Sequence, residues 1–283
     1  MEERVPEGWC DGDHWPVVIL VHGALDRAAS FARTALRLPD VAVAAYDRRG
    51  YQGSRDATPA TGIATHVDDL RQVTLAYAGD GPERRPVVAV GHSIGGTVVL
   101  GAAVASPELF VAVGAYEPTM PWLGFRRPEG EARTGEARTG EAAETRDEQP
   151  RRATAAAPGD PGDEAERFFK RVVGADAWDR LDDTQRATRR LDGPALVVDL
   201  RGVRGAPPFD VTALKVPTIV ASGGAASFPH HRQTAEWLAA HVASVRWTQV
   251  RDAGHGAHLS HPDAFAALVR EVLAAGGQPP ACD

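Results

Sequence analysis

The sequence predicts an α/β fold, in which a mostly parallel sheet carries helices on both faces and a small helical insertion covers one end. Short, continuous apolar runs alternate along the chain with longer amphipathic stretches, which is typical of buried parallel strands joined by crossover helices. The chain has 283 residues, of which 43% are hydrophobic, and this suits one large domain of this kind. A long interruption of the alternation, at residues 118–205, predicts the insertion.

Six apolar runs of strand length predict the sheet. They are Val17–Val21, Val41–Tyr46, Val87–Val90, Phe110–Ala115, Thr218–Ala221 and Val245–Val250. Four amphipathic or small-residue stretches predict the principal helices. They are Ile63–Ala78, Gly95–Ala105, Arg232–Ala243 and Pro262–Ala274. Because most of the strand runs are apolar throughout, we expect helices to cover both faces of the sheet.

The insertion divides into two parts of different composition. Residues 126–163 are charged and rich in Gly, Pro and Ala, and they include the near-repeat GEARTGEARTGEA at Gly130–Ala142. Such a segment buries too little apolar surface to offset the entropy of ordering, so we expect it to be flexible. From Glu164 onward large apolar residues recur at helical spacing, which predicts a small helical cap. The expected organisation is a core in two parts, residues 1–117 and 206–283, separated by a cap at 118–205.

Charge and hydropathy exclude several classes of partner. The formal net charge is −7 with both signs interspersed, so there is no basic stripe of the kind that binds nucleic acid. No apolar run approaches the roughly 18 residues that cross a membrane, and the first residues lack the apolar core of a signal peptide. Cys10 and Cys282, near opposite ends, do not imply a disulfide framework. We expect a cytoplasmic, bacterial protein that acts on a small molecule, and its oligomeric state stays open.

The segment Val87–Gly96 carries the strongest chemical signal. An apolar strand runs directly into Gly91-His92-Ser93-Ile94-Gly95 and then into a helix of small residues. This is the G-x-S-x-G pattern in the strand–turn–helix context that it requires. The serine must adopt a strained backbone on a sharp turn, and the glycines on either side avoid clashes there. The pattern predicts that Ser93 is a nucleophile at the carboxyl end of the sheet, next to a helix N-terminus that stabilises negative charge.

Three further segments stand where such an enzyme would need them. The strand Val17–Val21 ends in His22-Gly23, and Val41–Tyr46 is followed by Asp47-Arg-Arg-Gly-Tyr-Gln-Gly-Ser54. Late in the chain, Asp252-Ala-Gly-His255 follows the last strand. A loop at the carboxyl end of a strand can carry a histidine to within about 3 Å of a serine hydroxyl, so we expect His255 to be the general base.

As a set and in this order, these segments resemble the α/β-hydrolase superfamily from about Pro16 to Ala275. The resemblance implies an α/β-hydrolase sheet with a cap insertion and no cofactor. It also implies that the backbone N–H groups of Ala24 and Ile94 form the oxyanion hole. The turn at Asp47–Ser54 is mainly structural in that family, so we expect no catalytic role for Asp47 or Arg49.

The acid of the expected triad departs from the family pattern. The acid usually follows the strand predicted here at Thr218–Ala221, but Ser227 stands at that position. In several branches of the family the acid instead follows the preceding strand, where this chain has Glu117. We therefore expect Glu117 to orient His255. The alternatives are Asp210, which precedes its strand, Asp252, which is close in sequence to His255, and a dyad without an acid.

Several polar and aromatic residues remain as candidates for other roles. We expect Trp122, Phe228 and His230 to line the substrate pocket, and Asp26 at most to influence specificity. His258 and His261 follow His255 at three-residue spacing without a companion pattern for a metal site, so we expect hydrogen-bonding roles and no metal.

The leading interpretation is a serine hydrolase for a small or medium ester, thioester or lactone, working through a covalent acyl-enzyme. The same residues would also serve C–C bond hydrolysis, perhydrolysis, acyl transfer or cyclisation. A third interpretation is a non-catalytic ligand-binding protein on the same fold, suggested by Ser227 at the usual position of the acid.

Overall fold

The computed structural model describes residues 2–4, 16–79, 84–125 and 159–277. In this part of the chain one sheet has the strand order β1-β3-β2-β4-β5-β6-β7, and all neighbours from β3 to β7 are parallel. The parallel strands are β2 (Val17–Val21), β3 (Ala42–Tyr46), β4 (Val87–His92), β5 (Ala112–Tyr116), β6 (Thr218–Gly223) and β7 (Val245–Val250). All six predicted strands are therefore present.

Strand β1 (Glu2–Arg4) was not predicted. It pairs antiparallel with β3 at the edge of the sheet. Its sequence, Glu-Glu-Arg, has no apolar pattern. The strand pairs through backbone groups at the edge of β3, and such pairing cannot be predicted from side-chain periodicity.

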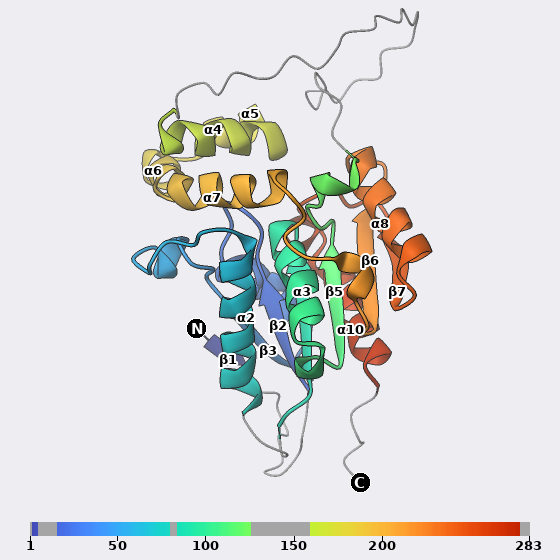
Figure 1. The fold of residues 1–283 in the computed structure, drawn as a ribbon. Helices are drawn as coiled ribbons and strands as arrows, with labels where there is room; N and C mark the ends of the chain where they lie inside the picture. Colours follow the sequence, from blue (N-terminus) through green and yellow to red (C-terminus); the bar gives the residue numbers. More distant parts are fainter. Residues whose placement is uncertain (1, 5–15, 80–83, 126–158, 278–283) are drawn as a thin grey trace, which may run out of the picture.

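Helices cover both faces of the sheet (Figure 1). Alternate residues of each strand point to opposite faces, so Val17 and Ile19 of β2 pack with the helices of one layer and Val18 and Leu20 with those of the other. The first layer holds α2 (Ile63–Ala78), α3 (Ile94–Ala105) and α8 (Pro229–His241), and the second α1 (Ala32–Ala35), α9 (Ala257–Ser260) and α10 (Pro262–Ala275). The fold class predicted from the sequence is thereby confirmed.

Short 3₁₀ helices punctuate the connections. They are η1 (Ala28–Phe31), η2 (Gln52–Ser54), η3 (Pro107–Leu109), η4 (Pro121–Leu123) and η5 (Val211–Ala213). One of them, η3, delays the start of β5, which the sequence placed at Phe110–Ala115. The observed strand ends at Tyr116, so Glu117 follows it without an intervening residue.

Four helices of the insertion lie over the end of the sheet where α2 and α3 begin (Figure 1). They are α4 (Pro161–Val172), α5 (Ala175–Asp179), α6 (Asp183–Leu191) and α7 (Gly193–Arg204). The sequence placed the start of the helical part at Glu164, but α4 begins three residues earlier. Asp160 caps it by accepting from the backbone N–H groups of Gly162 and Asp163, and Pro161 suits the first helical position.

The segment that we expect to be flexible, residues 126–163, overlaps the start of α4. Residues 161–163 form the first turn of α4, while residues 126–158, which include the near-repeat, lie outside the described part of the chain. Cys10 and Cys282 also lie outside it. None of the helices in the described ranges combines the length and the apolar composition that crossing a bilayer requires.

Candidate active site

Ser93 lies in the turn between β4 and α3, with φ 57° and ψ −123°. The glycine positions 91 and 95 leave no room for a larger side chain. A Cβ on Gly91 would lie 2.2 Å from the carbonyl oxygen of Gly95, and one on Gly95 would lie 2.1 Å from that of Val21. The close approach of strand, turn and helix therefore holds the serine in a conformation that non-glycine residues rarely adopt.

The side chains of Ser93, His255 and Glu117 form a continuous chain of hydrogen bonds. Nε2 of His255 lies 3.1 Å from Oγ of Ser93, and Nδ1 of His255 lies 2.6 Å from Oε2 of Glu117. Because a carboxylate only accepts, Nδ1 carries the proton, and Nε2 is left to accept from the serine hydroxyl. The structure thus brings together the three residues that the sequence singled out, from the β4–α3 turn, the β7–α9 loop and the residue after β5.

Glu117 is fully buried and has a left-handed backbone, with φ 48°. Burial alone would raise its pKa, but the hydrogen bond from His255, the nearby His231 and the hydroxyl of Ser227 together lower the pKa to about 2. Oε1 accepts from the backbone N–H of Gly223 at 2.7 Å and from Ser227, which leaves Oε2 for His255. Ser227 therefore donates to the carboxylate instead of replacing it.

Several contacts hold the loop that carries His255. The hydroxyl of Tyr116 donates to the carbonyl oxygen of Gly254 at 2.8 Å. Nε2 of His92 lies 2.8 Å from the backbone carbonyl oxygen of His255. The ring of His231 stacks on the ring of His255, with 4.7 Å between centroids and 9° between planes. The imidazole is thus fixed at its edge by a carboxylate and on its face by a second ring.

The loop after β2 carries the expected oxyanion donor, and Arg48 fixes its backbone. The guanidinium of this fully buried arginine donates to the carbonyl oxygens of His22 and Gly23, at 2.9 and 3.1 Å. The backbone N–H of Arg48 donates to Nε2 of His22, whose Nδ1 donates to the oxygen of Gly23. The loop also lies against the elbow, because a Cβ on Gly23 would be 3.0 Å from Cβ of Ser93. Both carbonyl oxygens are therefore occupied by hydrogen bonds, which fixes the backbone that leads to Ala24.

Arg48 is in turn neutralised by the insertion. Asp199 of α7 accepts from the guanidinium at 2.8 and 3.3 Å, from the hydroxyl of Tyr51 at 2.7 Å, and contacts Nε2 of His66 at 3.0 Å. Burial opposes the charged form of Asp199, but the cation of Arg48 and the contact with His66 hold the pKa of the carboxyl well below its ordinary value. Sequence reasoning missed both members of this pair, since nothing in the pattern of 48 and 199 indicates that they meet.

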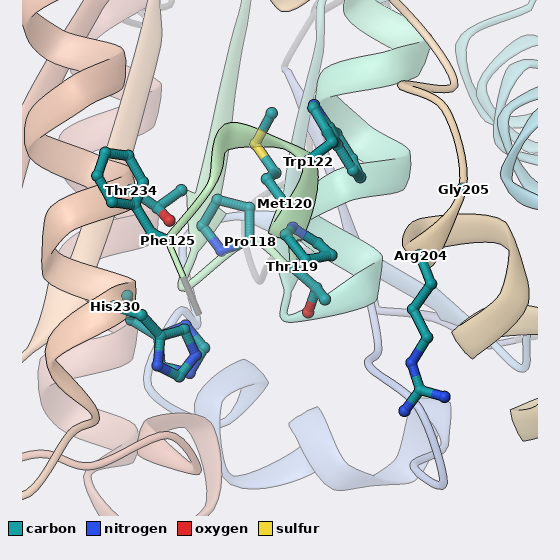
Figure 2. Close-up of a pocket in the computed structure, with 11 residues that line it drawn as sticks. Pro118, Thr119, Met120, Trp122, Phe125, Arg204, Gly205, His230 and Thr234 are labelled. Atoms are coloured by element: carbon teal, nitrogen blue, oxygen red, sulfur yellow. The ribbon is translucent and has the colours of Figure 1, made fainter. Parts of the chain in front are cut away.

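A cavity of about 480 Å³ lies close to Ser93, whose hydroxyl contacts one residue of its lining, and Figure 2 shows the lining residues. Its walls come from the loop after β5, the end of α7 and the start of α8. They include Trp122 and His230, as expected, and also His231 and Thr119. The hydroxyl of Thr119 lies 3.2 Å from Oγ of Ser93, which links the wall of the cavity to Ser93. Phe228 lies outside this lining and stacks on His230 instead, with 5.9 Å between centroids.

The alternative acids lie elsewhere. Asp210 accepts from the backbone N–H of Thr212 at the start of η5, and Asp252 sits in a turn with φ 62°. Asp47 accepts from the backbone N–H groups of Ala28 and Gly53, a structural role as expected.

Two groups of histidines and a carboxylate could offer ligands to a metal. In each, one ligand atom per residue lies within 4.8 Å of the others; the groups are Asp26, His92 and His258, and Glu117, His231 and His255. The companions of these histidines come from distant parts of the sequence, which local spacing does not reveal.

Comparison with known proteins agrees with this architecture. The sequence profile of the alpha/beta hydrolase family matches residues 18–268, nearly the whole described core. The chain belongs to the alpha/beta hydrolase family. This confirms the resemblance drawn from the motifs and makes the protein a hydrolase by family.

Individual proteins show how far the similarity reaches. Over 109 residues the chain is 36% identical to the lipase LipV of Mycobacterium tuberculosis, a match that covers 38% of this chain and 40% of LipV. A serine hydrolase involved in carbazole degradation superimposes with a TM-score of 0.63, covering 93% of this chain and 92% of that one at 18% identity. MenH from S. aureus gives 0.64 over 97% and 98% of the two chains at 13% identity. At these identities the two structures support the fold alone.

Proposed function

We propose that the protein is a serine hydrolase that cleaves a small or medium carboxylic ester, thioester or lactone through a covalent acyl-enzyme. The observation that carries the proposal is the unbroken hydrogen-bond chain from Ser93 through His255 to the buried Glu117. It supplies a nucleophile, a general base and an anion that stabilises the imidazolium. The name of the lipase LipV, which matches part of the chain, agrees with ester chemistry.

The residues suggest a definite sequence of steps. Oγ of Ser93 attacks the substrate carbonyl while Nε2 of His255 takes the hydroxyl proton. The N–H groups of Ala24 and Ile94 stabilise the oxyanion, and His255 then protonates the leaving group. Water, deprotonated by His255, hydrolyses the acyl-enzyme and restores Ser93. Ionised Glu117 balances the charge of His255 during both half-reactions.

The cavity favours an acyl or alcohol part of modest size. A volume of about 480 Å³ is at the small end of ligand sites. Met120, Trp122 and Phe125 supply apolar wall, while Thr119 and His230 supply polar groups. We propose that residues 118–205 act as the cap over this site and that it needs no cofactor.

Turnover of p-nitrophenyl acetate and butyrate tests the proposal. Ser93→Ala should lower kcat by roughly 10⁴–10⁶-fold, because the nucleophile and the relay act as a unit. Ser260→Ala, at an exposed serine of α9, is the matched control and should keep wild-type turnover. Equal turnover by Ser93→Ala and the wild type would overturn the proposal.

The remaining alternatives are separated by a wider panel. C–C hydrolysis, perhydrolysis and acyl transfer or cyclisation would each use the same Ser93, so their substrates are assayed with the same variant pair. A protein that only binds ligands would turn over no member of the panel.

A further inference from the structure

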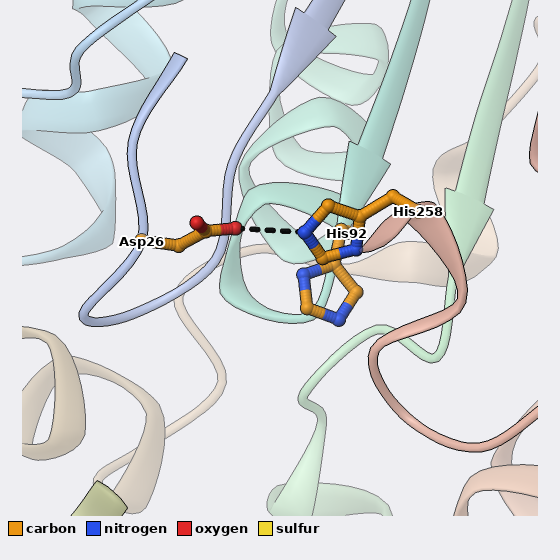
Figure 3. A group of neighbouring side chains, drawn as sticks. All are labelled: Asp26, His92 and His258. Atoms are coloured by element: carbon orange, nitrogen blue, oxygen red, sulfur yellow. Dashed lines mark hydrogen bonds and ion pairs between the residues drawn. The ribbon is translucent and has the colours of Figure 1, made fainter. Parts of the chain in front are cut away.

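Figure 3 shows a second cluster of histidines and a carboxylate. It lies next to the proposed relay, because His92 directly precedes Ser93, but its side chains are not part of the relay. It consists of Asp26 from the loop after β2, His92 from the end of β4 and His258 from α9. One nitrogen or oxygen of each residue lies within 4.8 Å of the other two. The three side chains thus converge from segments that are far apart in the sequence.

The tautomer of His92 follows from its hydrogen bond. Nε2 faces the carbonyl oxygen of His255 at 2.8 Å and must donate to it. Nδ1 of the neutral ring therefore carries a lone pair, and this buried atom has no hydrogen-bond partner among the described residues. It faces the loop that carries Asp26, because a Cβ on Gly23 would lie 3.0 Å from it.

His258 completes the group from the opposite side. Its Nε2 lies 3.0 Å from Oδ2 of Asp26, and the ring is 1% exposed. Nδ1 of His258 is also buried without a partner in the described part of the chain. The side chain of Asp26 is 16% exposed, so solvent reaches the cluster at the carboxylate. An unpartnered buried nitrogen is costly, and an ion held by the cluster would give Nδ1 of His92 a partner.

We propose that Asp26, His92 and His258 form a binding site for a divalent transition-metal ion of the zinc class. Two imidazole nitrogens and one carboxylate oxygen are the ligand types that Zn²⁺ prefers, whereas Mg²⁺ and Ca²⁺ favour oxygen alone. The bond from His92 to a backbone carbonyl is the outer contact that orients a metal-bound histidine. A water molecule entering past Asp26 would complete a tetrahedral set.

Occupancy would link three segments of the proposed active site. Asp26 lies two residues after Ala24, His92 directly precedes Ser93, and His258 lies three residues after His255. A bound ion would brace the oxyanion loop against the elbow and the histidine loop. This consequence rests on the proposed function, whereas ion binding itself does not.

The other group, Glu117, His231 and His255, is a competing site that the experiment must separate. Its atoms already form the relay, with Glu117 bonded to His255 at 2.6 Å and 3.6 Å from Nε2 of His231. An ion there would replace the hydrogen bond that orients the base, so binding would depend on His231 and not on Asp26.

Calorimetric titration of the chelator-treated full chain with ZnCl₂ tests the site, and the Tm with and without Zn²⁺ gives a second readout. The wild type should bind one Zn²⁺ that Asp26→Asn and His258→Phe bind at least tenfold more weakly, and Zn²⁺ should raise the wild-type Tm more than theirs. His231→Asn, in the competing group, and His241→Ala, at an exposed histidine of α8, are controls and should bind as the wild type does.

Two results would overturn the site. One is a wild type that binds no Zn²⁺; the other is an Asp26→Asn variant with the affinity of the wild type, including the case in which His231→Asn alone loses binding. Asp26→Asn preserves the shape of the side chain and decides the question if His258→Phe, among Phe31 and Phe265, fails to fold. None of these readouts depends on ester turnover, so failure of the metal site and failure of the proposed hydrolase are distinguishable.

Discussion

The two carboxylate oxygens of Glu117 have different hydrogen-bond partners. Oε1 accepts from Gly223 and Ser227, and Oε2 accepts from His255. The residue keeps a left-handed backbone at the end of β5, a conformation that costs about 1–3 kcal/mol and persists where the surroundings enforce it. We infer that this backbone conformation directs the carboxylate of Glu117 toward the end of β6. The acid follows that strand more often in the family.

Removing the charge of Glu117 tests its role. Glu117→Gln should lower kcat on p-nitrophenyl butyrate by about 10³–10⁴-fold, because an amide can neither hold the required tautomer nor stabilise the imidazolium. Ser227→Ala is the matched comparison, since it removes one donor to the distant oxygen and leaves the charge. Ser227→Ala should lower kcat far less than Glu117→Gln does. Steady-state kinetics of both variants decide, and unchanged turnover in Glu117→Gln would remove Glu117 from the relay.

Some residues of the site were predictable because a local pattern marks them. Ser93 is flanked by the glycines of the G-x-S-x-G pattern. Glu117 directly follows β5, and His255 lies in the loop after β7. Thr119 and Arg48 were missed for a physical reason. The hydroxyl of Thr119 reaches Ser93, and Arg48 reaches the carbonyl oxygens of His22 and Gly23, only when the sheet has formed, so no local pattern marks either residue.

At the scale of elements, α7 is tied to the core by a buried ion pair. Asp199 and Arg48 are both fully buried, and Arg48 holds the carbonyl oxygens of His22 and Gly23. Around them, Leu196 and Leu200 of α7 pack with Leu25 and Tyr51 in a small apolar cluster. Helix α7 of the insertion and the loop after β2 therefore share one network.

Breaking this pair should destabilise the protein strongly. Asp199→Ala leaves the guanidinium of Arg48 buried without its anion, which typically costs about 3–5 kcal/mol. Asp183→Ala, at a fully exposed aspartate of α6, should change the free energy of unfolding by less than about 0.5 kcal/mol. Urea denaturation measures both. A loss in Asp199→Ala no larger than that in Asp183→Ala would contradict the assigned role.

Elements with a strong apolar pattern were predicted to within one residue, among them β2, β3 and α2. The start of α4 was not, because it depends on a polar cap at Asp160 and on Pro161. Likewise β1 depends on a free backbone edge and has no apolar pattern of its own. Boundaries set by backbone hydrogen bonding are thus less visible in a sequence than those set by burial.

For the whole molecule, burial of ionisable groups makes stability depend on pH. Burial, followed by the charge of Arg48, lowers the pKa of His22 from 6.5 to about 4. The pKa of Glu117 falls from 4.5 to about 2, and that of Asp199 is also depressed. In each case the unfolded chain binds the proton at a higher pH than the folded chain does, so acid favours unfolding.

The free energy of unfolding should therefore be highest near neutral pH and should fall in two overlapping windows. The stabilisation that comes from His22 is lost as the pH falls from about 6.5 to about 4. The stabilisation that comes from Glu117 is lost as the pH falls from about 4.5 to about 2. Urea denaturation at a series of pH values measures this, with Glu117→Gln as the comparison, since the fall below about pH 4.5 should be smaller in that variant. Stability that stays constant or rises on acidification would contradict these pKa shifts.

The central claim, that Ser93 is the activated nucleophile, is tested most directly by covalent labelling. The full-length protein is treated with a fluorophosphonate, which reacts with activated serines, and the adduct is located by mass spectrometry of its peptides. The account predicts one adduct per chain, on Ser93, which disappears in Ser93→Ala and forms far more slowly in Glu117→Gln. An unlabelled wild type, or an adduct on another residue, would contradict it.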